Sequence, residues 1–129
     1  GVPETLKMLH GLMRMAVVTS SKRQHFETVH ADIGLIEYLE FVLAREDYRD
    51  AKPNPEPYLL ALQRLRMEAE QCIAVEDSER GLAAARAAGL RCLVIPNDMT
   101  RNCSFRGATA ILSGAVGVLD AIAVLSAEG

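Results

Sequence analysis

The chain has 129 residues, of which 50% are hydrophobic and 24% charged, with a formal net charge of −3. This length and composition are typical of a globular protein with its own hydrophobic core, so we expect residues 1–129 to form a single domain. No basic, aromatic-rich stripe supports a nucleic-acid surface, and no apolar run approaches the roughly 20 residues of a membrane span. The cysteines Cys72, Cys92 and Cys103 lack metal-ligand spacing, which favours reduced thiols and a cytoplasmic protein.

Short apolar runs alternate with helical periodicity along the chain. The apolar runs predict strands over residues 15–18, 41–44, 72–75, 92–95 and 108–112. Helices are predicted over residues 3–13, 21–34, 55–65, 78–89 and 113–126, with a further helical turn at 36–39. Strands and helices in alternation specify an α/β fold with a mainly parallel sheet and right-handed crossovers.

The central strand of this pattern runs directly into two acids, Glu76 and Asp77. Because Ser78 then opens an Ala-rich helix, both acids lie at the carboxyl edge of the sheet, where open α/β folds bind ligands. Adjacent carboxylates repel each other unless a cation lies between them, and Mg²⁺ prefers oxygen ligands. The pair therefore predicts an Mg²⁺ site. The alternative is that both acids merely favour the positive N-terminus of the helix.

Two other positions carry chemistry that binds phosphate. Thr19 ends the first strand beside a helix N-terminus, whose N–H groups attract an anion, although Thr19 could also simply cap that helix. Lys52 precedes a helix that starts at Pro55, and Pro53 restricts the direction in which the lysine points; the alternative is a solvated loop lysine. Together with the acidic pair, these groups suit phosphoryl transfer, which depends on positioning and charge stabilisation.

Four segments in this order and spacing resemble motifs of the haloacid dehalogenase superfamily. They are VVTSSK at 17–22, KPNP at 52–55, VEDSERG at 75–81 and AAGL at 87–90. Within that superfamily the chain is similar to the branch of β-phosphoglucomutase and sugar-phosphate phosphatases. The resemblance implies a Rossmann-like, three-layer α/β/α core and a small phosphorylated metabolite, such as a sugar phosphate, as substrate.

The resemblance also implies a role for each motif residue. Thr19 would bind the transferring phosphoryl group and Lys52 would neutralise its charge. Asp77 would ligate Mg²⁺, with Glu76 assisting directly or through water. The phosphate pocket would be completed by Ser20, Ser21 and Lys22.

The nucleophile of the family is absent from the sequence. Family members carry it in an Asp-x-Asp motif on their first strand, and no apolar strand of this chain ends in that pattern. The motif and the helical cap domain lie upstream of the segment corresponding to Gly1, so the chain resembles the later part of such an enzyme. The absent strand would lie centrally, between the strands that end at Thr19 and Glu76. Its two neighbours would then expose unpaired backbone.

Three arrangements would deal with the exposed edges: direct pairing of the two strands, a strand from another chain, or a piece that is made or processed separately. Since the aspartyl-phosphate step needs the carboxylate, we expect the chain alone to be inactive or nearly so. The leading hypothesis is an incomplete phosphatase core that acts on a small phosphate ester with Mg²⁺. The alternatives are a non-catalytic phosphate-binding or assembly module, for example a homodimer, a fragment of a phosphosugar mutase, or remnants that bind no ligand.

Overall fold

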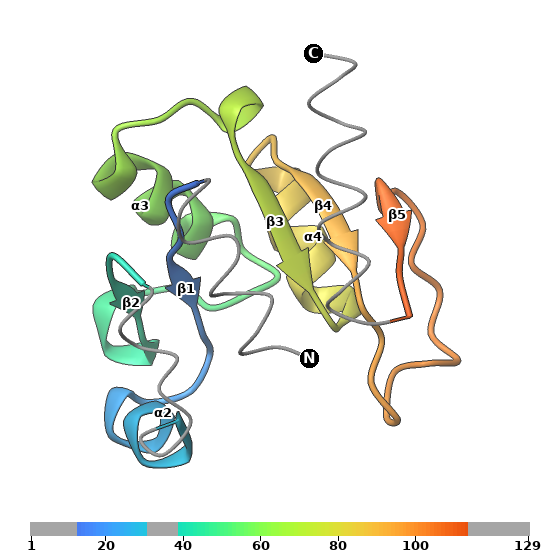
Figure 1. The fold of residues 1–129 in the computed structure, drawn as a ribbon, viewed down its shortest axis with the longest axis horizontal. Helices are drawn as coiled ribbons and strands as arrows, with labels where there is room; N and C mark the ends of the chain where they lie inside the picture. Colours follow the sequence, from blue (N-terminus) through green and yellow to red (C-terminus); the bar gives the residue numbers. More distant parts are fainter. Residues whose placement is uncertain (1–12, 31–38, 114–129) are drawn as a thin grey trace.

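The computed structural model describes residues 13–30 and 39–113, which form a layered α/β arrangement (Figure 1). The helices predicted over residues 3–13 and 113–126 and the turn at 36–39 fall almost entirely outside the described residues, as does the carboxyl end of the second predicted helix. Within the described ranges, no helix is long and apolar enough to span a membrane.

All five predicted strands are confirmed, with ends that differ from the prediction by one or two residues. They are β1 (Val17–Val18), β2 (Val42–Leu43), β3 (Ile73–Glu76), β4 (Arg91–Val94) and β5 (Ala110–Ile111). The helices between them are α2 (Arg23–His30), α3 (Glu56–Leu65) and α4 (Glu79–Ala87). Two short 3-10 helices lie in the connections, η2 (Arg45–Asp47) and η3 (Ala69–Gln71).

Local sequence sets the ends of the helices that flank the site. Ser78 caps α4, since its hydroxyl oxygen accepts a hydrogen bond from Gly81 N at 3.1 Å. Asn54 Oδ1 accepts from Glu56 N at 2.9 Å at the start of α3, one residue later than predicted. Beyond α4, Gly89 has φ +85°, a left-handed conformation that glycine adopts without strain, and the chain turns into β4.

The strands form two parallel sheets. β1 pairs with β2 in the register Val17 with Val42, and β3, β4 and β5 pair in that order, with Glu76 opposite Val94. The arrows of β1 and β3 point the same way in Figure 1, so their carboxyl ends lie on one side of the molecule. This confirms the predicted mainly parallel α/β fold in which a central strand is missing.

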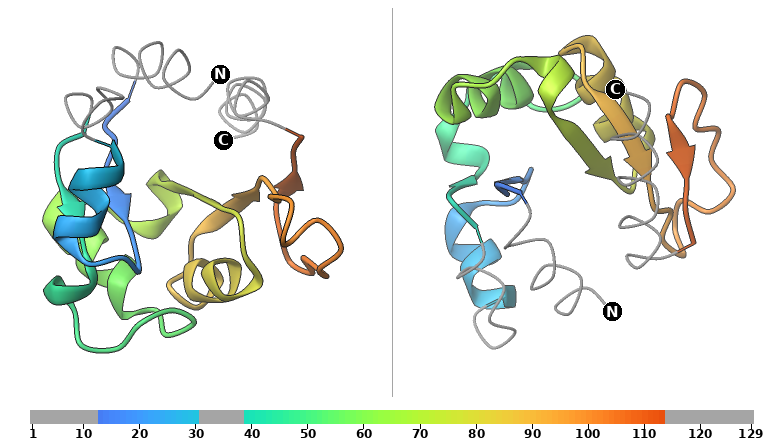
Figure 2. Two further views of the ribbon diagram at one scale, coloured as in Figure 1. Left: turned by 90° about the horizontal axis from the view of Figure 1, so that it is seen from below. Right: turned by 45° about the horizontal axis from the view of Figure 1, so that its top comes forward.

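Direct pairing of β1 with β3, one of the three arrangements expected from the sequence, does not occur among the described residues. The helix layer explains why. α3 packs against both β1 and α4, and α4 packs against β3 and β4 (Figure 2). Since packed helices lie about 8–10 Å apart and neighbouring strands about 4.8 Å apart, strands over adjacent helices are separated by about two strand spacings. Closing the interval would force α3 into α4.

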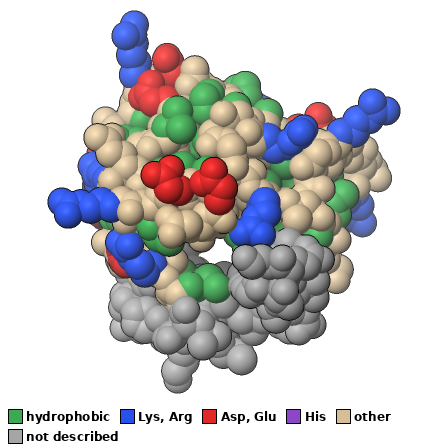
Figure 3. All heavy atoms as spheres, turned by 90° about the horizontal axis from the view of Figure 1, so that it is seen from above, with side chains coloured by type: hydrophobic (Ala, Val, Ile, Leu, Met, Phe, Trp, Pro, Cys, Tyr) green, Lys and Arg blue, Asp and Glu red, His purple; other side chains and the backbone are tan. Residues whose placement is uncertain are grey.

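The largest core cluster holds the β3–β5 sheet against α4. Ala84 and Ala85 are fully buried, and their small side chains let α4 approach the sheet closely. Cys92 and Val94 of β4 belong to the same cluster and are also fully buried. Figure 3 views the molecule from the top of Figure 1, away from the carboxyl ends of β1 and β3. On this face basic and acidic side chains are interspersed and form no continuous stripe. The core thus positions the carboxyl end of β3, where the acidic pair lies.

Candidate active site

A cavity of about 620 Å³ lies between the carboxyl ends of β1 and β3. Its wall includes six of the residues singled out from the sequence, Thr19, Ser20, Ser21, Lys52, Glu76 and Asp77. Lys22, the seventh, is exposed and does not line the cavity. Segments that are far apart in the sequence therefore meet at one place, as expected for the carboxyl edge of a parallel sheet.

Thr19 is held by its backbone, and its hydroxyl proton has no acceptor among the described residues. Its N–H donates to Leu43 O at 2.9 Å, and its carbonyl accepts from the Tyr48 hydroxyl at 2.8 Å. The Thr19 Oγ1 accepts from Ser21 N at 3.1 Å, which forms a local turn. Because this bond uses only the oxygen, the hydroxyl proton is available to a ligand in the cavity.

Lys52 is a buried residue, 9% exposed, and not a solvated loop lysine. Its ammonium donates to Val18 O at 3.0 Å and to Glu76 Oε2 at 2.6 Å. Arg80, which sequence reasoning missed, fixes the backbone of Lys52 through a 2.6 Å hydrogen bond from Nη2 to its carbonyl. An ammonium has three N–H groups, and the third has no hydrogen-bond acceptor among the described residues, although the ammonium also lies 5.1 Å from the centroid of the Tyr58 ring.

Glu76 is 8% exposed and takes part in a buried network. Its Oε2 accepts hydrogen bonds from both Lys52 and the Tyr58 hydroxyl of α3. Burial, and then the negative charge of Glu76, raises the pKa of Tyr58 well above its usual value, so the hydroxyl stays protonated and donates. On its other side the carboxylate lies against Gly81, where an added Cβ would come within 1.9 Å of Glu76 Oε1. Lys52 is therefore the cation that compensates Glu76.

Asp77 differs from its neighbour in both burial and partners. It is exposed, because side chains alternate between the two faces of an extended segment, and Val75 is exposed on the same side. Asp77 Oδ2 accepts from Asn97 Nδ2 at 3.1 Å, whereas Oδ1 has no donor in the part of the chain that is described. No group of three or more His, Cys, Asp or Glu side chains suited to a metal occurs among the described residues.

This arrangement fits Mg²⁺ if the main protein ligand of the ion is a single carboxylate. Mg²⁺ retains several waters and is often bound by one or two carboxylates together with a substrate phosphate. Asp77 offers an oxygen without a donor at the edge of the cavity, and Lys52 and Thr19 face the same space. Glu76 is already paired, so a direct role for it would require exchange of its partners.

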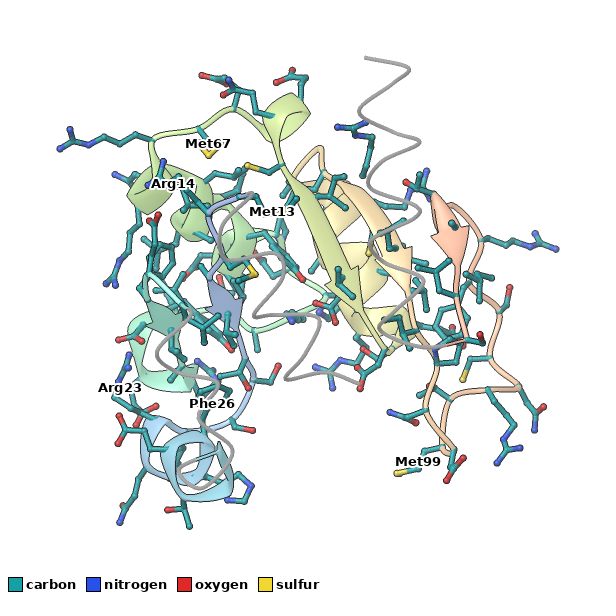
Figure 4. All side chains as sticks on the ribbon, viewed as in Figure 1. Met13, Arg14, Arg23, Phe26, Met67 and Met99 are labelled. Carbon is teal, nitrogen blue, oxygen red and sulfur yellow. The ribbon has the colours of Figure 1, made fainter. Side chains whose placement is uncertain are left out.

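Two further side chains of α2, Arg23 and His25, have different surroundings. Arg23, labelled in Figure 4, donates to Asp47 and to Val42 O, the latter at 3.0 Å. These bonds connect the start of α2 to the segment that follows β2. His25, by contrast, is exposed and lines the cavity. The periodicity of α3 placed Tyr58 on a helix but gave no sign of its bond to Glu76.

Comparison with known proteins identifies the family of this chain. Residues 1–95 match the family model described as haloacid dehalogenase-like hydrolase. The fructose-1-phosphate phosphatase YqaB of Escherichia coli (strain K12) is 38% identical over 87 residues, which are 67% of this chain and 46% of that protein. The crystal structure of CbbY from Rhodobacter sphaeroides in complex with phosphate is similar with a TM-score of 0.85 and 32% identity, over 92% of this chain and 54% of that chain.

The structure of CbbY in complex with xylulose bisphosphate is similar with a TM-score of 0.83 and 33% identity, over 89% of this chain and 53% of that chain. The chain thus spans about half the length of the relatives that it matches. The family model covers well over half of the chain, and the two CbbY structures share its fold. This chain belongs to the haloacid dehalogenase-like hydrolases.

Proposed function

We propose that this chain supplies the phosphoryl-binding and Mg²⁺-binding part of the active site of a phosphatase that acts on a small phosphorylated metabolite, such as a sugar phosphate. The observation that carries the proposal is that Thr19, Lys52 and Asp77 line one cavity at the carboxyl ends of β1 and β3. The names of the relatives support the substrate class, since one is a fructose-1-phosphate phosphatase and another was solved with phosphate.

In this proposal the chain's own residues bind and orient the phosphoryl group. The Thr19 hydroxyl and the third N–H of Lys52 donate to its oxygens, with Ser20 and Ser21 beside them in the wall of the cavity. Asp77 holds the Mg²⁺, and Glu76 keeps the Lys52 ammonium directed at the site. The metal, when bound, would neutralise charge that develops on the transferring group.

The nucleophile comes from a strand that binds between β1 and β3. The backbone of Val18 faces this interval, because the N–H groups of its neighbours Val17 and Thr19 donate to the chain at β2 and just before it. The backbone of Val75 faces it from the other side, because the Glu76 carbonyl accepts from Ile95, the residue that follows β4. β3 is an edge strand among the described residues, and the Val75 side chain on its face is 46% exposed.

The width of the interval, about two strand spacings, admits one strand. A strand that ends beside the Lys52 ammonium would place a carboxylate next to a positive charge. We assign this strand to a polypeptide segment outside the 129 residues, either a complementing chain or the missing part of the phosphatase.

The test is phosphate binding and turnover by the purified chain. Phosphorus NMR should detect binding of inorganic phosphate with Mg²⁺, and Lys52→Met should weaken it by about tenfold or more, since a charge-assisted hydrogen bond contributes about 1.5–3 kcal/mol. The rate at which the purified chain hydrolyses p-nitrophenyl phosphate should not exceed the rate of the Asp77→Asn variant. Absence of phosphate binding would refute the site, and turnover that disappears in Asp77→Asn would refute the absence of a nucleophile.

A synthetic β-strand peptide that ends in Asp-x-Asp tests the interval directly. Turnover should appear with this peptide and not with its Asn-x-Asn counterpart.

The facing edges of β1 and β3, which pair with no strand among the described residues, also favour a second function, a non-catalytic assembly module. A homodimer that covers the edges of β1 and β3 would bind phosphate without turnover. Sedimentation equilibrium distinguishes the phosphatase part from the assembly module. A homodimer should keep its mass when the strand peptide is added, because its strand edges are already covered, whereas a monomer should bind the peptide.

A further inference from the structure

The loop that follows β4 places two hydrogen bonds on Asp77. Asn97 Nδ2 donates to Asp77 Oδ2 at 3.1 Å. Thr100 Oγ1 donates to the Asp77 backbone carbonyl at 2.7 Å. The side chain and the main chain of Asp77 are thus held by two residues that lie 20 and 23 positions later in the sequence. Neither residue belongs to the motifs that identify the family.

The orientation of the Asn97 amide follows from its other contacts. Its Oδ1 accepts from the backbone N–H groups of Met99 at 2.8 Å and Thr100 at 3.0 Å. An amide side chain has one acceptor oxygen and one NH₂ group, so with the oxygen occupied by two donors the NH₂ must face Asp77.

The hydroxyl of Thr100 completes the loop. Its oxygen accepts from Asn97 N at 3.0 Å, and its single proton goes to the Asp77 carbonyl, which is closer than Asn97 Oδ1 at 3.2 Å. Pro96, whose ring fixes its own φ, lies between the end of β4 and this turn. The loop is therefore a closed set of hydrogen bonds that directs one N–H at the carboxylate.

The consequence concerns the other carboxylate oxygen. With Oδ2 held by Asn97, Asp77 Oδ1 is left without a donor among the described residues, at the edge of the cavity. Carboxylates that ligate metals are generally hydrogen-bonded by outer residues, which orient the ligating oxygen. We infer that Asn97 and Thr100 are positioning residues that hold Asp77 in the orientation that binds Mg²⁺. This inference rests on the metal site of the proposed function.

The test measures metal binding by the whole chain and does not depend on turnover. Mn²⁺ should broaden the Asp77 amide resonance in a ¹⁵N spectrum, and Mg²⁺ should reverse the broadening by competition. Asn97→Ser keeps a short acceptor for the turn and removes the amide that reaches Asp77. We expect its Kd for Mg²⁺ to rise by about tenfold or more, the range that loss of an outer partner produces.

Asp98→Asn is the matched control. Asp98 belongs to the same loop, is exposed and pairs with Arg101, so its loss should change the Kd by less than about twofold. The urea midpoints of both variants should equal that of the parent, which separates positioning of Asp77 from loss of the fold. If Asn97→Ser does not fold, Thr100→Val serves in its place and should also weaken Mg²⁺.

The outcomes distinguish the inference from the proposed function. A Kd for Asn97→Ser within twofold of the parent would overturn the positioning role and leave the metal site intact. No broadening at Asp77 in the parent chain would overturn the metal site, and the inference with it. An equal loss of affinity in Asp98→Asn would show that loop charge, and not orientation of Asp77, controls binding.

Discussion

Replacement of Gly81 by alanine should destabilise the protein through Glu76. An alanine Cβ would lie 1.9 Å from Glu76 Oε1 and 2.2 Å from its Cδ, far closer than non-bonded atoms tolerate. Since Gly81 is fixed in the first turn of α4, the carboxylate has to move. It then loses the 2.6 Å pair with Lys52 and the hydrogen bond from the Tyr58 hydroxyl.

The magnitude follows from two opposing terms. Disruption of a buried ion pair costs about 3–5 kcal/mol, whereas the helix preference of alanine over glycine returns at most about 1 kcal/mol. We therefore expect Gly81→Ala to lower the free energy of unfolding by about 2–4 kcal/mol. In urea denaturation, with a slope of about 1–3 kcal/mol per molar, the midpoint should fall by roughly 1 M or more.

A double-mutant cycle identifies the cause. In a Glu76→Ala background the clash has no partner, so Gly81→Ala should be neutral or slightly stabilising. Ala83→Gly, at an exposed position of the same helix, measures the propensity term alone and should cost about 1 kcal/mol. A stabilising effect of Gly81→Ala in the parent, or the same cost in both backgrounds, would refute the steric argument.

Three further perturbations test the surrounding structure. Tyr58→Phe removes one of the two donors to Glu76. Since a hydrogen bond to a charged group contributes about 1.5–3 kcal/mol, the free energy of unfolding measured by urea titration should fall by that amount. An unchanged urea midpoint would contradict the hydrogen-bond network around Glu76. Burial raises the pKa of Cys92 to about 12 and makes its thiol inaccessible. A thiol reagent at neutral pH should therefore label the exposed Cys103 first and Cys92 only after unfolding. Early labelling of Cys92 would contradict its burial. The Arg23 N–H, at the start of α2, donates to the Glu46 carboxylate and lowers the pKa of Glu46. This bond therefore stabilises the fold above the pKa of Glu46 in the unfolded chain, ~4.3, and the stabilisation is lost as pH falls through the lower pKa of the folded state. The protection factors of the α2 amides, which correct for the pH dependence of intrinsic exchange, should fall over that acid range in the parent and should not fall in Glu46→Gln.

Much of the fold was determined by local sequence. Each strand is a short apolar run, and each adjacent helix has its own start signal, such as Ser78, whose hydroxyl bonds only three residues ahead. Alternation of strands and helices then brings Thr19, Lys52 and Asp77 to one edge of the sheet, whatever the details of packing. Signals of this kind act over a few residues, which is why they could be recognised without the structure.

Only the tertiary structure decided which partners the site residues have. Two adjacent acids look equivalent in the sequence, but the alternation of side chains buries Glu76 against Lys52 and Tyr58 and leaves Asp77 exposed to Asn97. The partners of these groups lie 18 to 24 positions away, beyond the reach of any local pattern. The separation of β1 from β3 likewise depends on the width of α3 and α4, a packing distance that no strand sequence encodes.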